Sequence, residues 1–156
     1  MSDDQEKVGR SGKKLIIGAI LIAAGLYAVI GGILGATDNK KLFLAPSGSI
    51  RVEIVESHED RQRGLSGRDT IGDNEGMLFV FEQSSDQNCF WMKNMKFVID
   101  MVWLNDDRQV VSVESGVAPE TFPASFCPAS EAKYGLEVGQ GRAEALGLSE
   151  GESVRF

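Results

Sequence analysis

The longest apolar run of the chain extends from Leu15 to Ala36 and contains no charged residue. As an α-helix rising about 1.5 Å per residue, it would be roughly 33 Å long, enough to cross a hydrocarbon core of about 30 Å. Basic residues lie on both sides of it, with Lys7, Arg10, Lys13 and Lys14 before it and Lys40 and Lys41 after it. Because the flank with more Lys and Arg stays in the cytoplasm, the pattern predicts a cytoplasmic tail over residues 1–14 and a transmembrane signal anchor over residues 15–36. The prediction is a single-pass cell-membrane protein, in contact with membrane lipid, whose C-terminal domain is extracytoplasmic.

A cleaved signal peptide is the alternative interpretation of this run. The apolar region of such a peptide is usually about 7–15 residues long and is followed by small residues at the cut. The end of the run, Ile33-Leu34-Gly35-Ala36, fits that pattern poorly, which favours the anchor. Within the run, Ala24, Ala28 and Gly32 recur every fourth residue. This stripe would let two helices approach closely in a weak homodimer, although glycine and alanine are also simply common in membrane helices.

Beyond the run, apolar positions follow the short period of β-strands. Residues 37–49 are mostly polar and predict a linker, so the domain proper is expected over residues 50–156. Ile50, Val52 and Ile54 alternate with polar residues, as in a half-buried strand. Further strands are predicted by the apolar runs at residues 76–81, 89–93, 97–104, 109–113, 133–138 and 153–156.

Only two short helices are predicted in this domain. Ser57 followed by Asp60 resembles a capping box that opens a short polar helix, which Gly64 would end. Residues 142–146 suit one or two helical turns closed by Gly147. Neither helix is long enough for a crossover between parallel strands. The pattern therefore predicts a mainly β domain, a compact antiparallel β-sandwich or barrel-like fold with two short helices.

Composition and charge exclude several classes of function. The formal net charge of −7 argues against a nucleic-acid partner. Two cysteines and one histidine are too few for a histidine-rich or CxxC-type zinc site, and no metal or cofactor is expected. With His58 as the sole histidine, a Ser-His-Asp triad and a metalloprotease HExxH helix are also missing.

The two cysteines, Cys89 and Cys127, both lie in the part predicted to be outside the membrane. In an oxidising compartment a lone pair of this kind tends to form a disulfide. Closing a loop of this length would stabilise the fold by roughly 4 kcal/mol in the chain-entropy model. The alternative is a reactive thiol, but neither cysteine is in a CxxC pair or near the histidine in sequence. The sequence therefore favours a structural disulfide.

Several blocks of the domain resemble a known family. In chain order they read RQRGLSGRD, EGMLFVF, FWMKNMKFVIDMVWL, FCPASEAKYGLEV and GRAEALGLSEGESVRF. They resemble the "domain of unknown function" family number 192 over residues 50–156, and Phe90 to Asn94 is the most specific piece. The resemblance implies a mostly β fold, often exported or membrane-anchored, and it supplies no catalytic residue. Members often carry tandem cysteines near the late Cys-Pro, whereas here the second cysteine is Cys89, so no pairing is carried over from the family.

Two acidic residues, Asp100 and Glu137, lie inside otherwise apolar predicted strands. A buried carboxylate needs a partner, because an unpaired charge is costly away from water. For Asp100 the basic candidates are Lys93, Lys96 and Arg63, and a cap for backbone N–H groups is the other structural interpretation. The functional interpretation is a carboxyl group with a shifted pKa in a pocket. The two residues together would form an acid/base pair of the kind that glycosidases use.

The most specific block contributes Trp91, Lys93 and Asn94 as a candidate ligand site. A tryptophan beside a lysine and an amide would suit a sugar or an anionic group. Alternatively, Trp91 fills the core while Lys93 extends to water. Arg63 belongs to a basic cluster around the first predicted helix, which is either an anion-binding patch or an ordinary solvated face.

These observations favour a membrane-anchored envelope protein whose β module binds a ligand or partner. The candidate partners are an envelope glycan, a small molecule or another envelope protein. The alternative is a hydrolase or lyase acting on a carbohydrate-like substrate, with Asp100 and Glu137 as acid and base and Lys93 stabilising negative charge.

Overall fold

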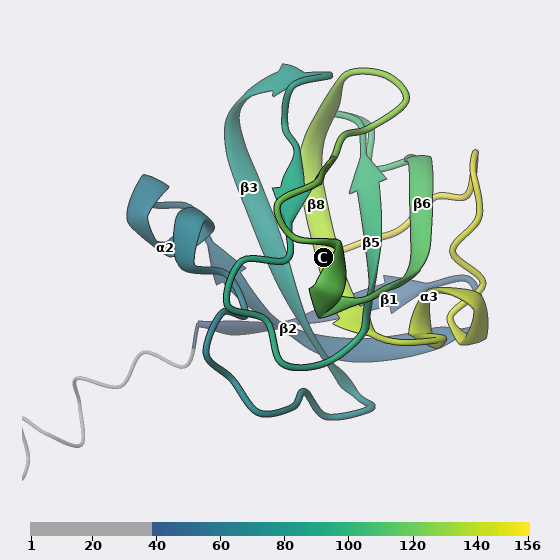
Figure 1. Ribbon diagram of the computed structural model, residues 1–156. Helices are drawn as coiled ribbons and strands as arrows, with labels where there is room; N and C mark the ends of the chain where they lie inside the picture. The colour runs from purple at the N-terminus through teal and green to yellow at the C-terminus, as the bar shows by residue number, and fades with distance from the viewer. Residues whose placement is uncertain (1–38) are drawn as a thin grey trace, which may run out of the picture. The chain divides into compact units, whose positions relative to one another are not determined.

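The computed structural model of the protein describes residues 39–156, which contain a six-stranded sheet and a two-stranded ribbon (Figure 1). The sheet has the order β1-β2-β3-β8-β5-β6, and β4 pairs with β7. The strands are β1 (Lys40–Ala45), β2 (Gly48–Val55), β3 (Glu75–Ser85), β4 (Phe90–Trp91), β5 (Ile99–Leu104), β6 (Val110–Val117), β7 (Ser125–Phe126) and β8 (Ala132–Gly139). The helices are α2 (His58–Arg63), α3 (Arg142–Ala145) and the 3-10 turn η1 (Pro119–Thr121).

The predicted tail, anchor and helix-dimer stripe at residues 1–36 lie outside the described residues. Within residues 39–156, no helix is both long enough and apolar enough to cross a bilayer.

The domain is mainly β with two short helices, as the sequence predicts, but its sheet is mixed rather than purely antiparallel. β2 and β3 run parallel, with Val52 opposite Gly76 and Ile54 opposite Leu78. A parallel pair needs a crossover of a dozen or more residues, which is usually a helix. Here residues 56–74 make the crossover with the single short helix α2 and a series of turns. The expectation that short helices exclude parallel strands was therefore wrong.

The predicted linker over residues 37–49 is also corrected, because it contains the edge strand β1. β1 pairs antiparallel with β2, with Phe43 opposite Ile50. Only Phe43 of this strand is fully buried, whereas Leu42 is 55 % exposed. With one fully buried side chain, the strand shows no alternating pattern that sequence analysis can detect.

Two other predicted strands are shorter than expected. The run at residues 89–93 is a strand only at Phe90–Trp91, after which the chain turns at Lys93 and Asn94. The predicted last strand forms isolated bridges, Ser153 to Gln109 and Arg155 to Leu44. The C-terminal segment therefore contacts β1 at one edge of the sheet and the start of β6 at the other, through backbone bonds that include Val110 N to Glu152 O at 2.9 Å.

Both predicted helix signals are confirmed. The Ser57 hydroxyl accepts a hydrogen bond from the Asp60 backbone N–H at 3.1 Å, which satisfies one of the free donors of the first turn of α2. The helix ends at Gly64, whose φ of 48° favours glycine. The second helix is followed by Gly147 with φ of 70°.

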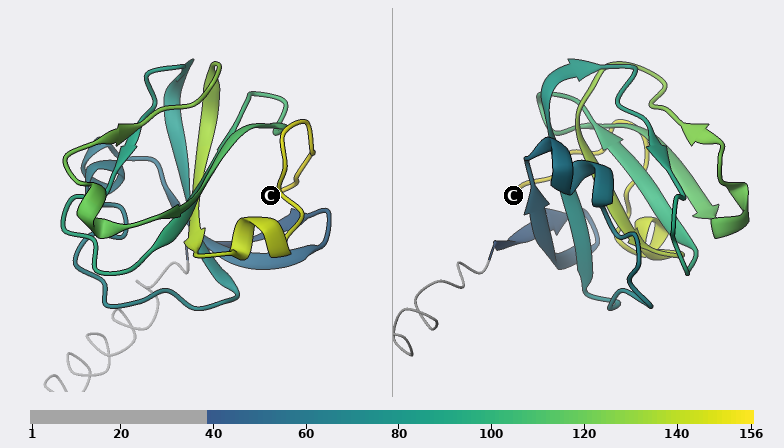
Figure 2. Two further views of the ribbon diagram at one scale, coloured as in Figure 1. Left: turned by 45° about the vertical axis from the view of Figure 1, so that its right-hand side comes forward. Right: turned by 60° about the vertical axis from the view of Figure 1, so that its left-hand side comes forward.

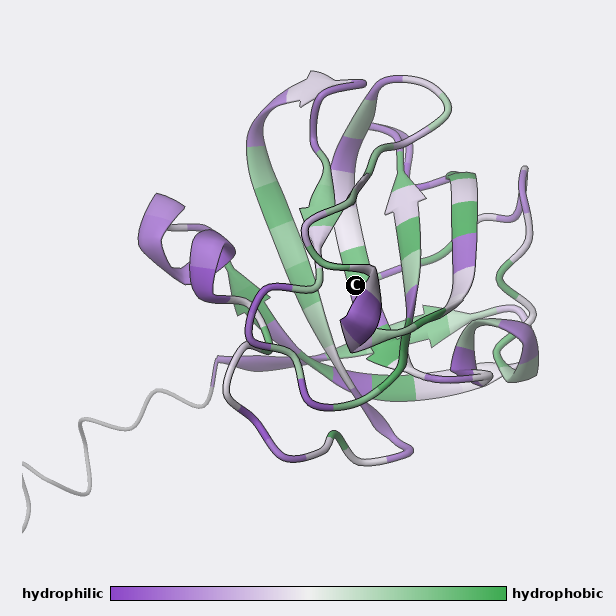
Figure 3. Cartoon of the chain, viewed as in Figure 1, coloured by the Kyte–Doolittle hydropathy of each residue, from purple (hydrophilic) through white to green (hydrophobic). Residues whose placement is uncertain are grey.

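Alternating side chains of the sheet form two apolar layers, one on each face. The left-hand view of Figure 2 shows α3 (yellow) and the segment around η1 and β7 (green) on opposite sides of the central strands. One layer packs against α3 and the C-terminal segment and includes Phe43, Val52, Leu78, Val102, Leu136, Leu146 and Val154. The other packs against the segments around α2 and β4 and includes Leu65, Met77, Phe79, Phe90, Met92, Met101 and Trp103. The hydropathy colouring shows the contrast between these apolar central strands and the polar helix α2 (Figure 3).

Gly135 on β8 leaves room for the Phe90 ring. A Cβ at this position would lie 2.3 Å from Phe90 Cζ, and the ring is held by Phe79 and Trp103 at centroid distances of 4.7 Å and 5.3 Å.

We expect Gly135→Ala to lower the free energy of unfolding by about 1–3 kcal/mol, because the crowded ring has no free space to move into. Chemical denaturation monitored by circular dichroism measures this, with Gly48→Ala as the matched strand control, since its Cβ would make ordinary contact at 3.5 Å. Equal stability of the Gly135→Ala variant and the wild type would contradict the packing described.

Candidate functional site

A pocket of about 320 Å³ opens on the face of the sheet that carries Glu137. Five chain segments build it: α2 with its following turn, β3, the segment that contains β4, β7, and β8. The residues that line it are His58, Arg61, Gln62, Arg63, Gly64, Leu65, Ser66, Phe79, Phe81, Gln87, Asn88, Cys89, Phe90, Trp91, Met95, Ser125 and Glu137. Its walls thus combine four large aromatic rings and one carboxyl group with a histidine, two arginines and several amide and hydroxyl side chains.

Glu137 is the buried acidic residue among those that line this pocket. It is 4 % exposed, and its cross-strand neighbours on the same face are Met77 of β3 and Met101 of β5, both fully buried. Its Oε2 atom is buried and has no hydrogen-bond partner. The turn after α2 passes close to it, because a Cβ on Gly64 would lie only 3.6 Å from this oxygen.

Burial among apolar side chains raises the pKa of Glu137 to about 8. The Leu65 backbone N–H and the charge of Arg68 act in the opposite direction but do not outweigh desolvation. At neutral pH the side chain is therefore mostly a neutral carboxylic acid, which both donates and accepts hydrogen bonds. A neutral acid of this kind can give its proton to a bound acceptor, or it can ionise when a cation binds.

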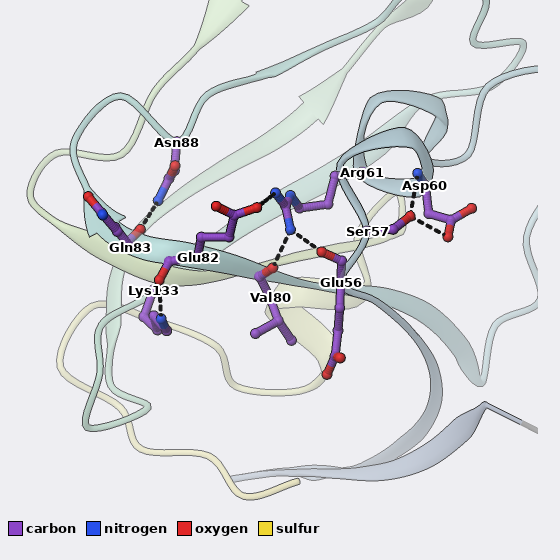
Figure 4. Close-up of polar contacts among 9 residues, drawn as sticks. All are labelled: Glu56, Ser57, Asp60, Arg61, Val80, Glu82, Gln83, Asn88 and Lys133. Atoms are coloured by element: carbon purple, nitrogen blue, oxygen red, sulfur yellow. Dashed lines mark hydrogen bonds and ion pairs between the residues drawn. The ribbon is translucent and has the colours of Figure 1, made fainter.

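The two arginines of the pocket are already paired with carboxylates. Arg61 donates to Val80 O at 3.0 Å, contacts Glu82 Oε1 at 3.3 Å and also donates to Glu56 O, so it fastens α2 to β3 (Figure 4). Arg63 pairs with Asp60 on the same helix. Arg61 is therefore mainly structural, and neither side chain presents an unpaired positive charge to a ligand.

Asn88 and Cys89 form a rigid part of the wall. The Asn88 amide donates to Gln83 O at 2.9 Å and to Ala132 O at 2.8 Å, and its backbone carbonyl accepts from Trp103 Nε1 at 2.8 Å. The predicted disulfide between Cys89 and Cys127 is present, with a Cα–Cα distance of 4.1 Å. These contacts fix the segment that leads into β4.

Asp100 is not part of the pocket. It is buried on the opposite face of the sheet and accepts backbone hydrogen bonds from Gly116 at 2.9 Å and from Ala143 at 3.0 Å. Of the two structural interpretations, the backbone cap is therefore the one observed; the basic candidate Lys96 pairs instead with Asp69. Asp100 lies opposite Val138 rather than Glu137, so the two carboxyl groups point to different faces and do not meet as an acid/base pair.

The Trp91, Lys93 and Asn94 group is divided by the turn after β4. Trp91 lines the pocket and is 43 % exposed, so it does not fill the core, a role that belongs to Trp103. Lys93 is exposed, with its ammonium nitrogen 5.4 Å from the Trp91 ring centroid. Asn94 occupies a left-handed turn with φ of 57°, and its carbonyl accepts from Gly67 N. Of the six candidate site residues, the structure thus brings Arg63, Trp91 and Glu137 together at the pocket.

The aromatic wall was missed by sequence reasoning. Phe79, Phe81 and Phe90 looked like ordinary core positions of buried strands. Phe79 and Phe81 share a face with Glu137 only through the register between β3 and β8, for which the sequence carries no signal. Within the described part of the chain, no group of three or more histidine, cysteine, aspartate or glutamate side chains is placed to hold a metal ion.

The fold is shared with two solved bacterial proteins. One is a protein of unknown function from Novosphingobium aromaticivorans, with a TM-score of 0.66 and 25 % identity over 75 % of this chain and 84 % of that one. The other is described as a putative transcription regulator from Sinorhizobium meliloti, with a TM-score of 0.65 and 26 % identity over 73 % of this chain and 89 % of that one. No curated protein matches the chain.

The architecture is thus that of a small mixed-sheet β domain with a side pocket. The family model DUF192, described as "Uncharacterized ACR", matches residues 43–156. The chain belongs to this family, which is the one that its sequence blocks resemble.

Proposed function

We propose that this chain is a membrane-anchored envelope protein whose β domain binds a small molecule in the pocket at Glu137. The observation that carries the proposal is the buried, unpartnered Oε2 atom of Glu137 in the wall of a pocket that four aromatic rings also line. Buried polar atoms in folded proteins nearly always have a hydrogen-bond partner. A buried polar atom without such a partner destabilises the fold, because it has lost its hydrogen bonds to water. A bound ligand would supply the partner.

The membrane part of the proposal rests on the apolar run at residues 15–36 and its basic flank. The binding part rests on the pocket, whose size lies at the small end of the range for ligand sites. A hydrolase or lyase that uses Asp100 and Glu137 as a pair is not supported, because such chemistry needs both carboxyl groups at one bond.

The pocket is tested by blocking it from α2. Gln62 is exposed and lines the pocket, whereas Glu59 is exposed on the same helix and is not among the lining residues. We expect small-molecule fragments that raise the unfolding temperature of the full-length chain in detergent to lose at least about tenfold in affinity for Gln62→Trp and to retain it for Glu59→Trp. Affinity is measured by ligand-observed NMR. If no fragment binds, or if both variants bind as the wild type does, this pocket is not the ligand site.

A further inference from the structure

We infer that the ligand of this pocket is a small organic amine in its ammonium form, with an N–H group on the Glu137 carboxyl and an apolar body against the aromatic walls. The inference rests on the proposed function and adds the chemical class of the ligand.

The first argument is charge. Glu137 contributes the only acidic side chain among the pocket-lining residues of the described chain, and one of its oxygens lacks a donor. The nearby arginines already have carboxylate partners: Arg63 pairs with Asp60, Arg61 with Glu82, and Arg68 with Glu53. An anionic ligand would therefore meet a carboxyl group and arginines that are already paired. An ammonium ion would supply the missing donor and neutralise Glu137 as it ionises.

The second argument is the wall around this carboxyl group. Phe79, Phe81, Phe90 and Trp91 all line the pocket. The faces of aromatic rings carry partial negative charge and attract cations within about 6 Å of the centroid. The protein already uses Trp91 in this way, because the Lys93 ammonium nitrogen lies 5.4 Å from its ring centroid. The same chemistry is therefore available to an ammonium group inside the pocket.

The third argument separates an amine from a neutral sugar. A sugar needs several unoccupied polar partners around its hydroxyl groups. Here the Asn88 amide is held by Gln83 O and Ala132 O, and the Ser66 hydroxyl donates to Lys93 O at 2.7 Å. With Asn88 and Ser66 engaged in this way and the carboxyl group flanked by methionines, we assign the charged head of the ligand to Glu137 and its apolar body to the aromatic rings.

The experiment compares three monosubstituted benzenes of similar size: benzylamine, benzyl alcohol and benzoate. Their binding to the full-length chain in detergent is measured by isothermal titration calorimetry at pH 7 with wild type, Glu137→Gln and Glu114→Gln. The last variant changes an exposed glutamate of β6 outside the pocket. We expect benzylamine to bind at least about tenfold more tightly than benzyl alcohol, to lose that advantage in Glu137→Gln and to keep it in Glu114→Gln.

Proton release gives a second readout that a merely structural role of Glu137 would not produce. Because the pKa of free Glu137 is about 8, an ammonium ligand that ionises it at pH 7 releases close to one proton per molecule bound. Titrations in two buffers of different ionisation enthalpy count these protons.

Glucosamine and N-acetylglucosamine form a second matched pair, which distinguishes an amino sugar from a simple free amine as the source of the ammonium group.

The outcomes separate the two proposals. If benzyl alcohol or benzoate binds as tightly as benzylamine, and Gln62→Trp still abolishes that binding, the pocket is a ligand site but the ammonium class is wrong. If benzylamine binds without proton release and equally to Glu137→Gln, the contact with Glu137 is also wrong. If none of the five compounds binds, the amine inference is overturned, and the fragment test then decides the pocket independently.

Discussion

Replacing Glu137 by glutamine should stabilise the protein, and the gain should grow as pH rises. In the unfolded chain this carboxyl group has an ordinary pKa of 4.5, whereas burial raises the folded-state pKa to about 8. Between these two values the folded state holds a proton that the unfolded state has lost, so the free energy of unfolding falls as pH rises. At about 1.4 kcal/mol per pKa unit, this amounts to about 5 kcal/mol lost between pH 4.5 and pH 8, with no further change above that range.

Denaturation of the full-length chain at a series of pH values measures this effect. The expected result is that the difference in stability between Glu137→Gln and wild type increases steadily from pH 5 to pH 8. Glu114→Gln serves as the control and should follow the wild type throughout, because that glutamate is exposed. A difference that stays constant with pH would mean that Glu137 is not a buried neutral acid.

Removing the disulfide should lower the stability of the protein, by nearly as much as the wild type loses between pH 4.5 and pH 8. Cys89 and Cys127 are separated by 38 residues in sequence, and a crosslink over such a loop restricts the unfolded chain by about 4 kcal/mol. We expect the double variant Cys89→Ser with Cys127→Ser to lose about that much stability. The pocket should also loosen, since Cys89 lies in its wall.

Chemical denaturation with and without dithiothreitol measures the contribution of the disulfide. The reductant should lower the midpoint of the wild type to that of the double variant and should leave the double variant unchanged. A wild type whose midpoint does not respond to full reduction, verified by counting free thiols, would show that the crosslink adds no stability.

Local signals in the sequence predict local structure well in this protein. The capping residues Ser57 and Gly64 mark both ends of α2, and the apolar run containing Asp100 becomes β5. β1 could not be found in this way, because its pairing with β2 depends on one buried side chain, Phe43. The parallel pairing of β2 and β3 was missed for a similar reason, since it depends on tertiary packing around a crossover that has little helix.

The candidate site, too, can be predicted from the sequence only in part. An acidic residue in an apolar strand marks Glu137 as unusual, and the structure gives it a pocket. The separation of Glu137 from Asp100 depends on the register between β5 and β8, where a shift of one residue exchanges the two faces. Single-strand alternation carries no information about that register. The aromatic wall likewise depends on segments brought together only by folding.

The bonds made by the last residues of the chain have a consequence for solubility. Aggregation by strand pairing between molecules, as in fibrils, starts at an edge strand whose backbone N–H and C=O groups are unpaired. Arg155 occupies such groups on Leu44, and Glu152 occupies one on Val110. The C-terminal segment thus covers part of both edge strands, β1 and β6. Deleting this segment would expose these backbone groups and favour aggregation through strand pairing.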